Sequence, residues 1–284
     1  MPGDNAQEVK FQHYVPQFYL RYFGNPLYCF DKKNGEVFKT SPRRICAEDY
    51  FYGKAEQGKP SIESTLCQEE GQANLAFQEL MALQDFEKLQ ADNKEAIYRH
   101  VVRQEIRTNE FKKRIESLGK LWYKFGIENK LPLPSEEEVI EAPKRVQLEI
   151  LDEETDFLFK HIRKLKPIIG INKTAYPFFT SDHPVNRYSL NEGDIGLVSL
   201  GVAIQFPISP TIMLSLCDSR VLKAEANSRI EVIDEECVTH ANSLQVRDST
   251  RFIISTTDEF SLVRRILADY PELKDPDRKR TEPG

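Results

Sequence analysis

The sequence lacks the features that mark exported, disulfide-stabilised or zinc-binding proteins. Its five cysteines are an odd number, and none of them belongs to a C-x-x-C pair. This pattern predicts neither a disulfide framework nor a structural zinc site. Residues 1–10 contain no apolar segment of the signal-peptide kind, and no apolar run reaches the length of a transmembrane helix. We therefore expect a cytoplasmic protein that does not enter a membrane.

Common enzyme signatures are also missing. The chain has no phosphate-binding or dinucleotide-binding glycine loop, no H-E-x-x-H, no G-x-S-x-G and no internal repeat. Its formal net charge of −6 argues against a general coat for long duplex nucleic acid, although a local basic patch stays open. The sequence names no cofactor, and it leaves metal dependence and oligomeric state open.

Length and patterning predict one large domain. A chain of 284 residues with 40% hydrophobic content can bury a sizeable core. We expect a single α+β domain over residues 11–270, between a flexible leader at 1–10 and a disordered tail at 271–284. It should comprise an N-terminal helix and a hairpin around Asn34-Gly35, a long helical middle at about 61–166, and a C-terminal mixed β-sheet packed on the helices. Predicted core residues are Phe18, Phe178, Phe179, Phe206 and Ile208.

One histidine lies inside the dense apolar segment at residues 11–23. Pro16 suits the first turn of a helix, so His13 should lie just before the start of that helix. The imidazole is then either a satisfied core group or a general base or phosphate ligand beside free backbone donors.

The helix predicted at about 93–125 carries polar groups where its apolar face should be buried. Gln104 falls in the middle of that face and Arg107 on its margin. A buried amide without partners costs about 1–3 kcal/mol, and a buried guanidinium costs more unless an anion faces it. These two residues therefore predict either a buried polar network or a ligand. Glu63 and Glu70 share a face of the preceding helix, either as solvated surface groups or as carboxylates in a shared cleft.

Asp182 ends an apolar strand in the stretch Tyr176-Pro-Phe-Phe-Thr-Ser-Asp-His-Pro-Val185. Polar side chains at the end of a strand are a common site position. The alternative is a strand end closed by an Asx-turn.

These landmarks, taken together, resemble domain-of-unknown-function family 4238. The resemblance rests on order and spacing over nearly the whole chain, in the blocks His13-Tyr-Val-Pro-Gln-Phe-Tyr-Leu-Arg-Tyr-Phe23, Gln104 with Arg107-Thr108, Phe179-Thr-Ser-Asp-His-Pro-Val185, Phe206-Pro-Ile-Ser-Pro210, and Asn242 before Arg251-Phe-Ile253. It implies a microbial protein of roughly this length, and some members of the family look like components of antiphage defence. It carries over no reaction. Asn is more usual where this chain has His183, so the resemblance does not imply an obligatory catalytic role for His183.

Three readings of the polar residues follow. In the first, the chain is a nuclease or other hydrolase acting on phosphodiesters, with RNA or a nucleotide as substrate. His13 is then general acid or base, Asp182 orients it or holds a metal, Arg107 neutralises a phosphate, and Gln104 positions substrate or water. In the second, the chain is a non-catalytic ligand-binding or sensor module of a defence system with a phage-derived trigger. In the third, the four residues form a structural network. We expect all four to line one cleft.

Overall fold

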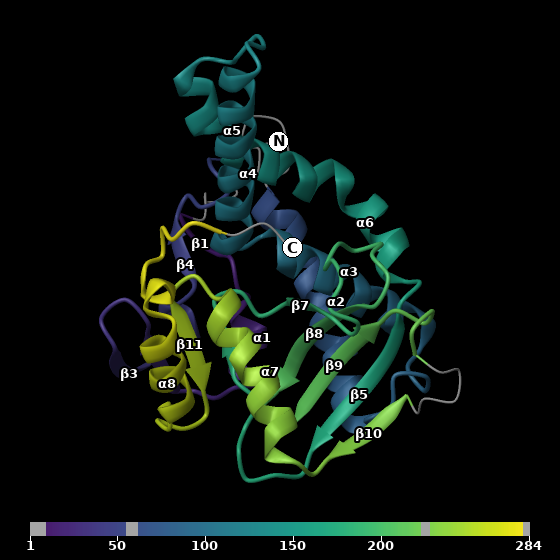
Figure 1. Ribbon diagram of the computed structural model, residues 1–284. Helices are drawn as coiled ribbons and strands as arrows, with labels where there is room; N and C mark the ends of the chain where they lie inside the picture. Colours follow the sequence, from purple (N-terminus) through teal and green to yellow (C-terminus); the bar gives the residue numbers. More distant parts are fainter. Residues whose placement is uncertain (1–9, 55–61, 223–227, 281–284) are drawn as a thin grey trace, which may run out of the picture.

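The computed structural model describes residues 10–54, 62–222 and 228–280, and its architecture is α+β as predicted (Figure 1). The N-terminal region, apart from its hairpin, comprises β1 (Phe11–His13), α1 (Gln17–Arg21), the 3-10 helix η1 (Pro42–Arg44) and β4 (Ala47–Asp49). Strands β1 and β4 pair antiparallel. Helix α1 starts after Pro16, whose extended backbone and missing N–H suit the position before a first turn. Of the predicted leader only Lys10 lies within the described residues.

The hairpin predicted around Asn34-Gly35 forms and belongs to a four-stranded sheet. The strand order is β3 (Glu36–Thr40), β2 (Leu27–Asp31), β11 (Phe252–Ser255) and β6 (Thr180–Ser181), with every pair antiparallel. Gly35 has a φ of +76°, the left-handed conformation that such a turn requires. The N-terminal hairpin therefore shares a sheet with β6, the strand that Asp182 follows.

The second large sheet has five strands and is mixed. Its order is β10 (Arg229–Val232), β5 (Lys166–Asn172), β9 (Ile212–Cys217), β8 (Val202–Ser209) and β7 (Asn186–Ser189). Only the β10–β5 pair is parallel. Helix α7 (Glu235–Asp248), capped by Asp234, covers one face, where Val238 and Ala241 pack against Met213.

The helical middle contains more breaks than its periodicity predicts. Its elements are α2 (Ile62–Leu83), α3 (Ala91–Ile106), α4 (Asn109–Glu128), α5 (Glu136–Glu149), the π-helical turn η2 (Ile150–Glu154) and α6 (Thr155–Ile162). The helix predicted at about 93–125 is two helices, because Thr108 adopts an extended backbone and its side chain caps α4 at the N–H of Phe111. Helices α4 and α5 run side by side and project away from the sheets as an arm (Figure 1).

Helices α2 and α3 pack on the other face of the five-stranded sheet. The rings of Phe77 on α2 and His100 on α3 both lie 5.9 Å from that of Phe206 on β8. Phe178, Phe179, Phe206 and Ile208 are buried as predicted, and Phe18 packs partly buried against the same core. Among the described residues, no helix is long and apolar enough to cross a membrane.

The C-terminal region is more structured than its composition predicts. Helix α8 (Ser261–Asp269) and the 3-10 helix η3 (Pro271–Lys274) precede a segment whose Arg278 and Arg280 both reach Glu110 on α4. The expectation of a disordered tail at 271–284 is therefore wrong for residues 271–280, because a buried carboxylate supplies the counter-charge that holds the arginines. Residues 281–284 lie outside the described residues.

Candidate functional site

Arg107 lies at the end of α3, where three parts of the chain meet. Its guanidinium donates to the Tyr52 hydroxyl at 2.8 Å, to Glu70 Oε1 at 2.7 Å and to the main-chain carbonyl of His13 at 2.6 Å. Burial alone disfavours the charge, but Tyr52 and Glu70 raise the pKa of Arg107 above its usual value. Because Glu70 already supplies the facing anion, a phosphate would have to displace it.

His13 contributes mainly its backbone to this network. The residue is 8% exposed, with Nε2 3.2 Å from the carbonyl of Arg43 on η1 and the Phe11 ring packed edge-on at 5.5 Å. A carbonyl can only accept, so Nε2 carries the proton and Nδ1 keeps its lone pair. Burial lowers the pKa of His13, which favours the neutral imidazole at pH 7.

Gln104 is fully buried and forms a hydrogen bond with the backbone of Tyr14, the residue after His13. Its Nε2 donates to the carbonyl of Tyr14 at 3.0 Å. Its Oε1 is buried and has no hydrogen-bond partner within the described ranges. Of the two possibilities that the sequence left open, the contacts favour a polar network, with one acceptor unsatisfied.

Asp182 follows β6, and its carboxylate binds the backbone of residues 250–252 and not the Arg107 network. Its carboxylate accepts the N–H groups of Thr250, Arg251 and Phe252 at 2.9, 2.7 and 3.0 Å, which shapes the turn leading into β11. Burial raises the pKa of Asp182, while Lys32 and the three N–H donors act in the opposite direction. Thus His13, Gln104 and Arg107 meet around the main-chain carbonyls of residues 13 and 14, whereas all the hydrogen bonds found for the Asp182 carboxylate go to residues 250–252.

The space beside this network is small. A hollow of about 10 Å³ lies between α2 and α3, bordered by Glu70, His100, Arg103 and Arg107. A single water needs about 10–15 Å³, so the hollow has no room for a nucleotide. Nearby, Glu63 has a buried Oε2 without a described hydrogen-bond partner, and burial raises the pKa of Glu63. No group of three or more His, Cys, Asp or Glu side chains in the described parts of the chain is placed to hold a metal.

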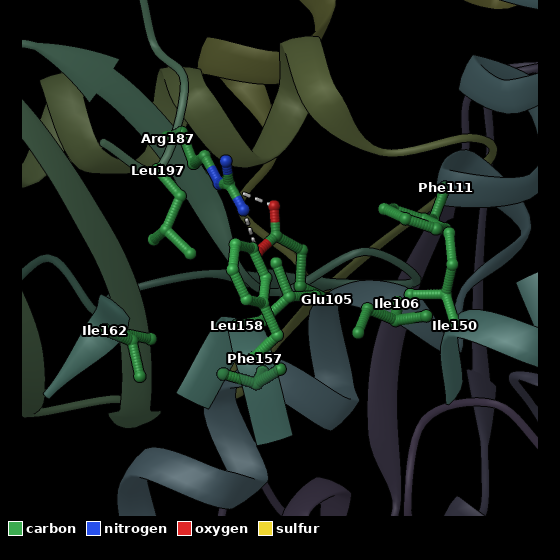
Figure 2. Close-up of a pocket in the computed structure, with 10 residues that line it drawn as sticks. Glu105, Ile106, Phe111, Ile150, Phe157, Leu158, Ile162, Arg187 and Leu197 are labelled. Carbon is green, nitrogen blue, oxygen red and sulfur yellow. Dashed lines mark hydrogen bonds and ion pairs between the residues drawn. The ribbon is translucent and has the colours of Figure 1, made fainter. Parts of the chain in front are cut away.

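A larger cavity lies on the opposite flank of α3 and was missed by the sequence reasoning. It has a volume of about 260 Å³, and Figure 2 shows its walls. These come from α3, α4, the π-helical turn η2, α6, β7 and the loop after β7. The residues are Val102, Glu105, Ile106, Phe111, Ile150, Phe157, Leu158, Ile162, Arg187 and Leu197. No sequence motif marks a site assembled from so many elements, although a π-helical turn in a helix often accompanies function.

The cavity has one polar feature in an otherwise apolar lining. Arg187 on β7 faces Glu105 on α3, with Nε 2.7 Å from Oε1 and Nη2 2.8 Å from Oε2 (Figure 2). Only the Nη2 contact has hydrogen-bond geometry, and the Nε contact is a close approach of opposite charges without a hydrogen bond; Glu105 is almost fully buried. The pair joins the helical middle to the sheet at the cavity wall.

Comparison with known protein families agrees with the resemblance read from the sequence. The model of the family described as "Protein of unknown function (DUF4238)" matches residues 12–259. The chain belongs to this family. The match spans β1 through β11 and therefore includes both the polar network and the cavity of this DUF4238 chain. No curated protein and no solved structure matches it.

Proposed function

We propose that this DUF4238 protein is a non-catalytic ligand-binding module whose cavity takes a small molecule with an apolar body and one polar group. The observation that carries the proposal is the 260 Å³ cavity with its single ion pair, Glu105–Arg187. Small-molecule sites are typically about 300–1,000 Å³, mostly apolar, with a few placed polar groups, so this cavity suits a compact ligand.

The position of the cavity supports a sensing role. Its walls belong both to the helical middle and to β7 of the sheet, so a ligand would contact two elements that the Glu105–Arg187 pair also links. A ligand that binds one arrangement of these elements better than another shifts the population toward it. The defence setting and a phage-derived trigger remain predictions that rest on the family resemblance.

Thermal unfolding with three probes tests the proposal. Indole presents an apolar ring and one N–H that suits Glu105; octanoate presents an apolar chain and a carboxylate that suits Arg187; adenosine monophosphate is a nucleotide control. We expect indole or octanoate to raise the melting temperature, with about 2.7 kcal/mol of stabilisation at 100 times the dissociation constant.

A matched pair of variants assigns the effect to the cavity. Leu158→Trp fills the cavity and should abolish the shift, whereas Leu75→Trp places the same side chain on the exposed face of α2 and should preserve it. Equal shifts in both variants, or no shift with any probe in the unmodified protein, would refute the proposal.

The second candidate is the phosphodiester hydrolase acting on RNA or a nucleotide. One observation favours it: burial lowers the pKa of His13 and raises that of Glu63, and both groups sense the charges of Glu70 and Arg107. Buried titratable groups with perturbed pKa values that share charged neighbours are candidates for the acid and base of a catalytic site. In this candidate His13 is the base and Glu63 the acid, Arg107 and Gln104 support the substrate, and Asp182 organises the fold.

Turnover assays separate this candidate from ligand binding. Purified protein is incubated with single-stranded RNA, single-stranded DNA and nucleotides, each with and without EDTA. The hydrolase candidate requires activity that His13→Ala and Glu63→Gln abolish and Leu158→Trp preserves. If no substrate is turned over under any of these conditions, the hydrolase candidate is rejected and the ligand-binding module is the candidate that stays.

A further inference from the structure

The arm formed by α4 and α5 carries an exposed apolar stripe. Leu118, Leu121, Trp122 and Phe125 follow one another at spacings of three, one and three residues, which places them on one face of α4. They are 49%, 45%, 68% and 47% exposed. This face of α4 is therefore exposed to solvent, although its leucine and aromatic side chains suit a helix–helix contact.

The exposed area at the tip of the arm is large for a surface without a partner. Trp122 and Phe125 alone leave on the order of 250 Å² in solvent, given the size of aromatic side chains. Leu131 and Leu133, 49% and 38% exposed, lie in the turn that folds back onto Gly126 beside the stripe. Contiguous apolar patches of this kind mark interaction sites, and aromatic residues dominate the energetics of interfaces.

The charges on the arm indicate which partner would cover the apolar stripe. Lys124 lies on the flank of α4 next to the stripe and Lys120 lies further round the helix, and their described partners, Glu128 and Glu116, are neighbours on the same helix. Helix α5 begins with exposed acids, and Glu137 and Glu141 form no ion pair with any residue of the described segments. The arm therefore offers a basic edge on one helix and an acidic surface on the other, which is the complementarity that a second copy of the same arm can satisfy.

Symmetry then fixes how two copies meet. If the two-fold axis runs along the arms, the helices are parallel and the basic edge of one copy faces the acidic surface of the other. In an antiparallel contact, basic would face basic and acidic would face acidic. In the first arrangement the tips lie at the same end. Lys124 is four residues before the end of α4 and Glu141 is five residues after the start of α5, so these charges lie at similar heights. We infer that the protein forms a parallel homodimer in which the α4 stripes pack together and the two α4–α5 arms make a four-helix bundle.

Trp122 makes the inference directly measurable, because it is the only tryptophan in the chain. Sedimentation equilibrium should show a monomer–dimer equilibrium, and the emission of Trp122 should shift to shorter wavelength over the same concentration range. Phe125→Glu should weaken dimerisation by at least about 30-fold, the size of a hot-spot loss, and leave Trp122 solvent-exposed. Leu75→Glu, at an apolar position on α2 that is more exposed than Phe125, should change neither readout.

Charge reversal tests the parallel geometry. Lys124→Glu and Glu141→Lys should each weaken the dimer, and the double variant should recover most of the affinity, because the opposed charges then exchange places. A chain that stays monomeric up to about 100 µM, where even weak specific interfaces associate, with unshifted Trp122 emission would overturn the inference. A dimer indifferent to Phe125→Glu, or lacking recovery in the double variant, would overturn it as well.

Discussion

Replacing Glu110 with Gln should remove the group that fixes the C-terminal segment. Glu110 is 2% exposed on the first turn of α4, and its carboxylate contacts Arg278, Arg280 and the hydroxyl of Thr250. Burial alone would raise the pKa of Glu110, but Arg280 and Arg278 lower it to about 2. Glu110→Gln keeps the shape of the side chain and deletes the charge that these arginines face.

The magnitude follows from the linkage between pKa and stability. Lowering a carboxyl pKa from its ordinary 4.5 to about 2 corresponds to roughly 3 kcal/mol at 1.4 kcal/mol per factor of ten. Because the pKa is lower in the folded state, this stabilisation is fully present above pH 4.5 and is lost as the pH falls toward 2. Urea unfolding at pH 7 should therefore show Glu110→Gln to be less stable by roughly 3 kcal/mol, and the difference should shrink across that window.

A carboxylate on the same helix provides the control. Glu116 pairs with Lys120 at 2.6 Å on the exposed side of α4, and such surface pairs contribute about 0–1 kcal/mol. Glu116→Gln should therefore lie within 1 kcal/mol of the unmodified protein. A loss below about 1 kcal/mol for Glu110→Gln at pH 7, or a difference between it and the unmodified protein that persists at pH 2, would refute the reasoning.

Three further predictions concern residues that the sequence singled out, all measured by urea unfolding at pH 7. Phe179→Ala should destabilise by about 3–5 kcal/mol, because its fully buried ring packs against Phe260; a loss below 1 kcal/mol would contradict its core position. Asp182→Ala should cost roughly 3–5 kcal/mol by leaving three N–H groups without their acceptor, and Asp182→Asn should cost less; equal losses would contradict the capping role. Arg107→Lys keeps the charge but cannot reach all three acceptors, so it should lose about 1–3 kcal/mol; an unchanged stability would contradict the network.

The sequence predicts elements well where a local signal specifies them. Asn34-Gly35 specifies its hairpin, Pro16 precedes the first turn of its helix, and the apolar run before Asp182 is buried. The break at Thr108 was missed because no Gly or Pro accompanies it. Its cap depends on one threonine hydroxyl, which also lies 2.6 Å from Nδ1 of His183.

The candidate site was harder to predict because sequence shows side chains and not their partners. Burial of Gln104 and Arg107 followed from helical periodicity, but each donates to a main-chain carbonyl, that of residue 14 or 13, which no residue type reveals. The cavity has no local signal at all, since its walls come from α3, α4, η2, α6, β7 and the following loop. Whether His13, Gln104, Arg107 and Asp182 act in catalysis remains a prediction.

Three of the blocks that carry the family resemblance meet at the junction between α3 and α4. Arg107 binds the His13 carbonyl there, Thr108 meets His183, and Gln147 from α5 donates to the carbonyls of Ile106 and Thr108 at 2.7 and 2.9 Å. This joint fixes the base of the arm next to Phe111, which lines the cavity and lies on the same face of α4 as the exposed stripe. A ligand that moves Phe111 therefore acts at the base of the proposed dimer contact. In this proposal the blocks of the family resemblance hold the α3–α4 junction rigid, the cavity beside it binds the ligand, and the stripe on α4 binds the second copy.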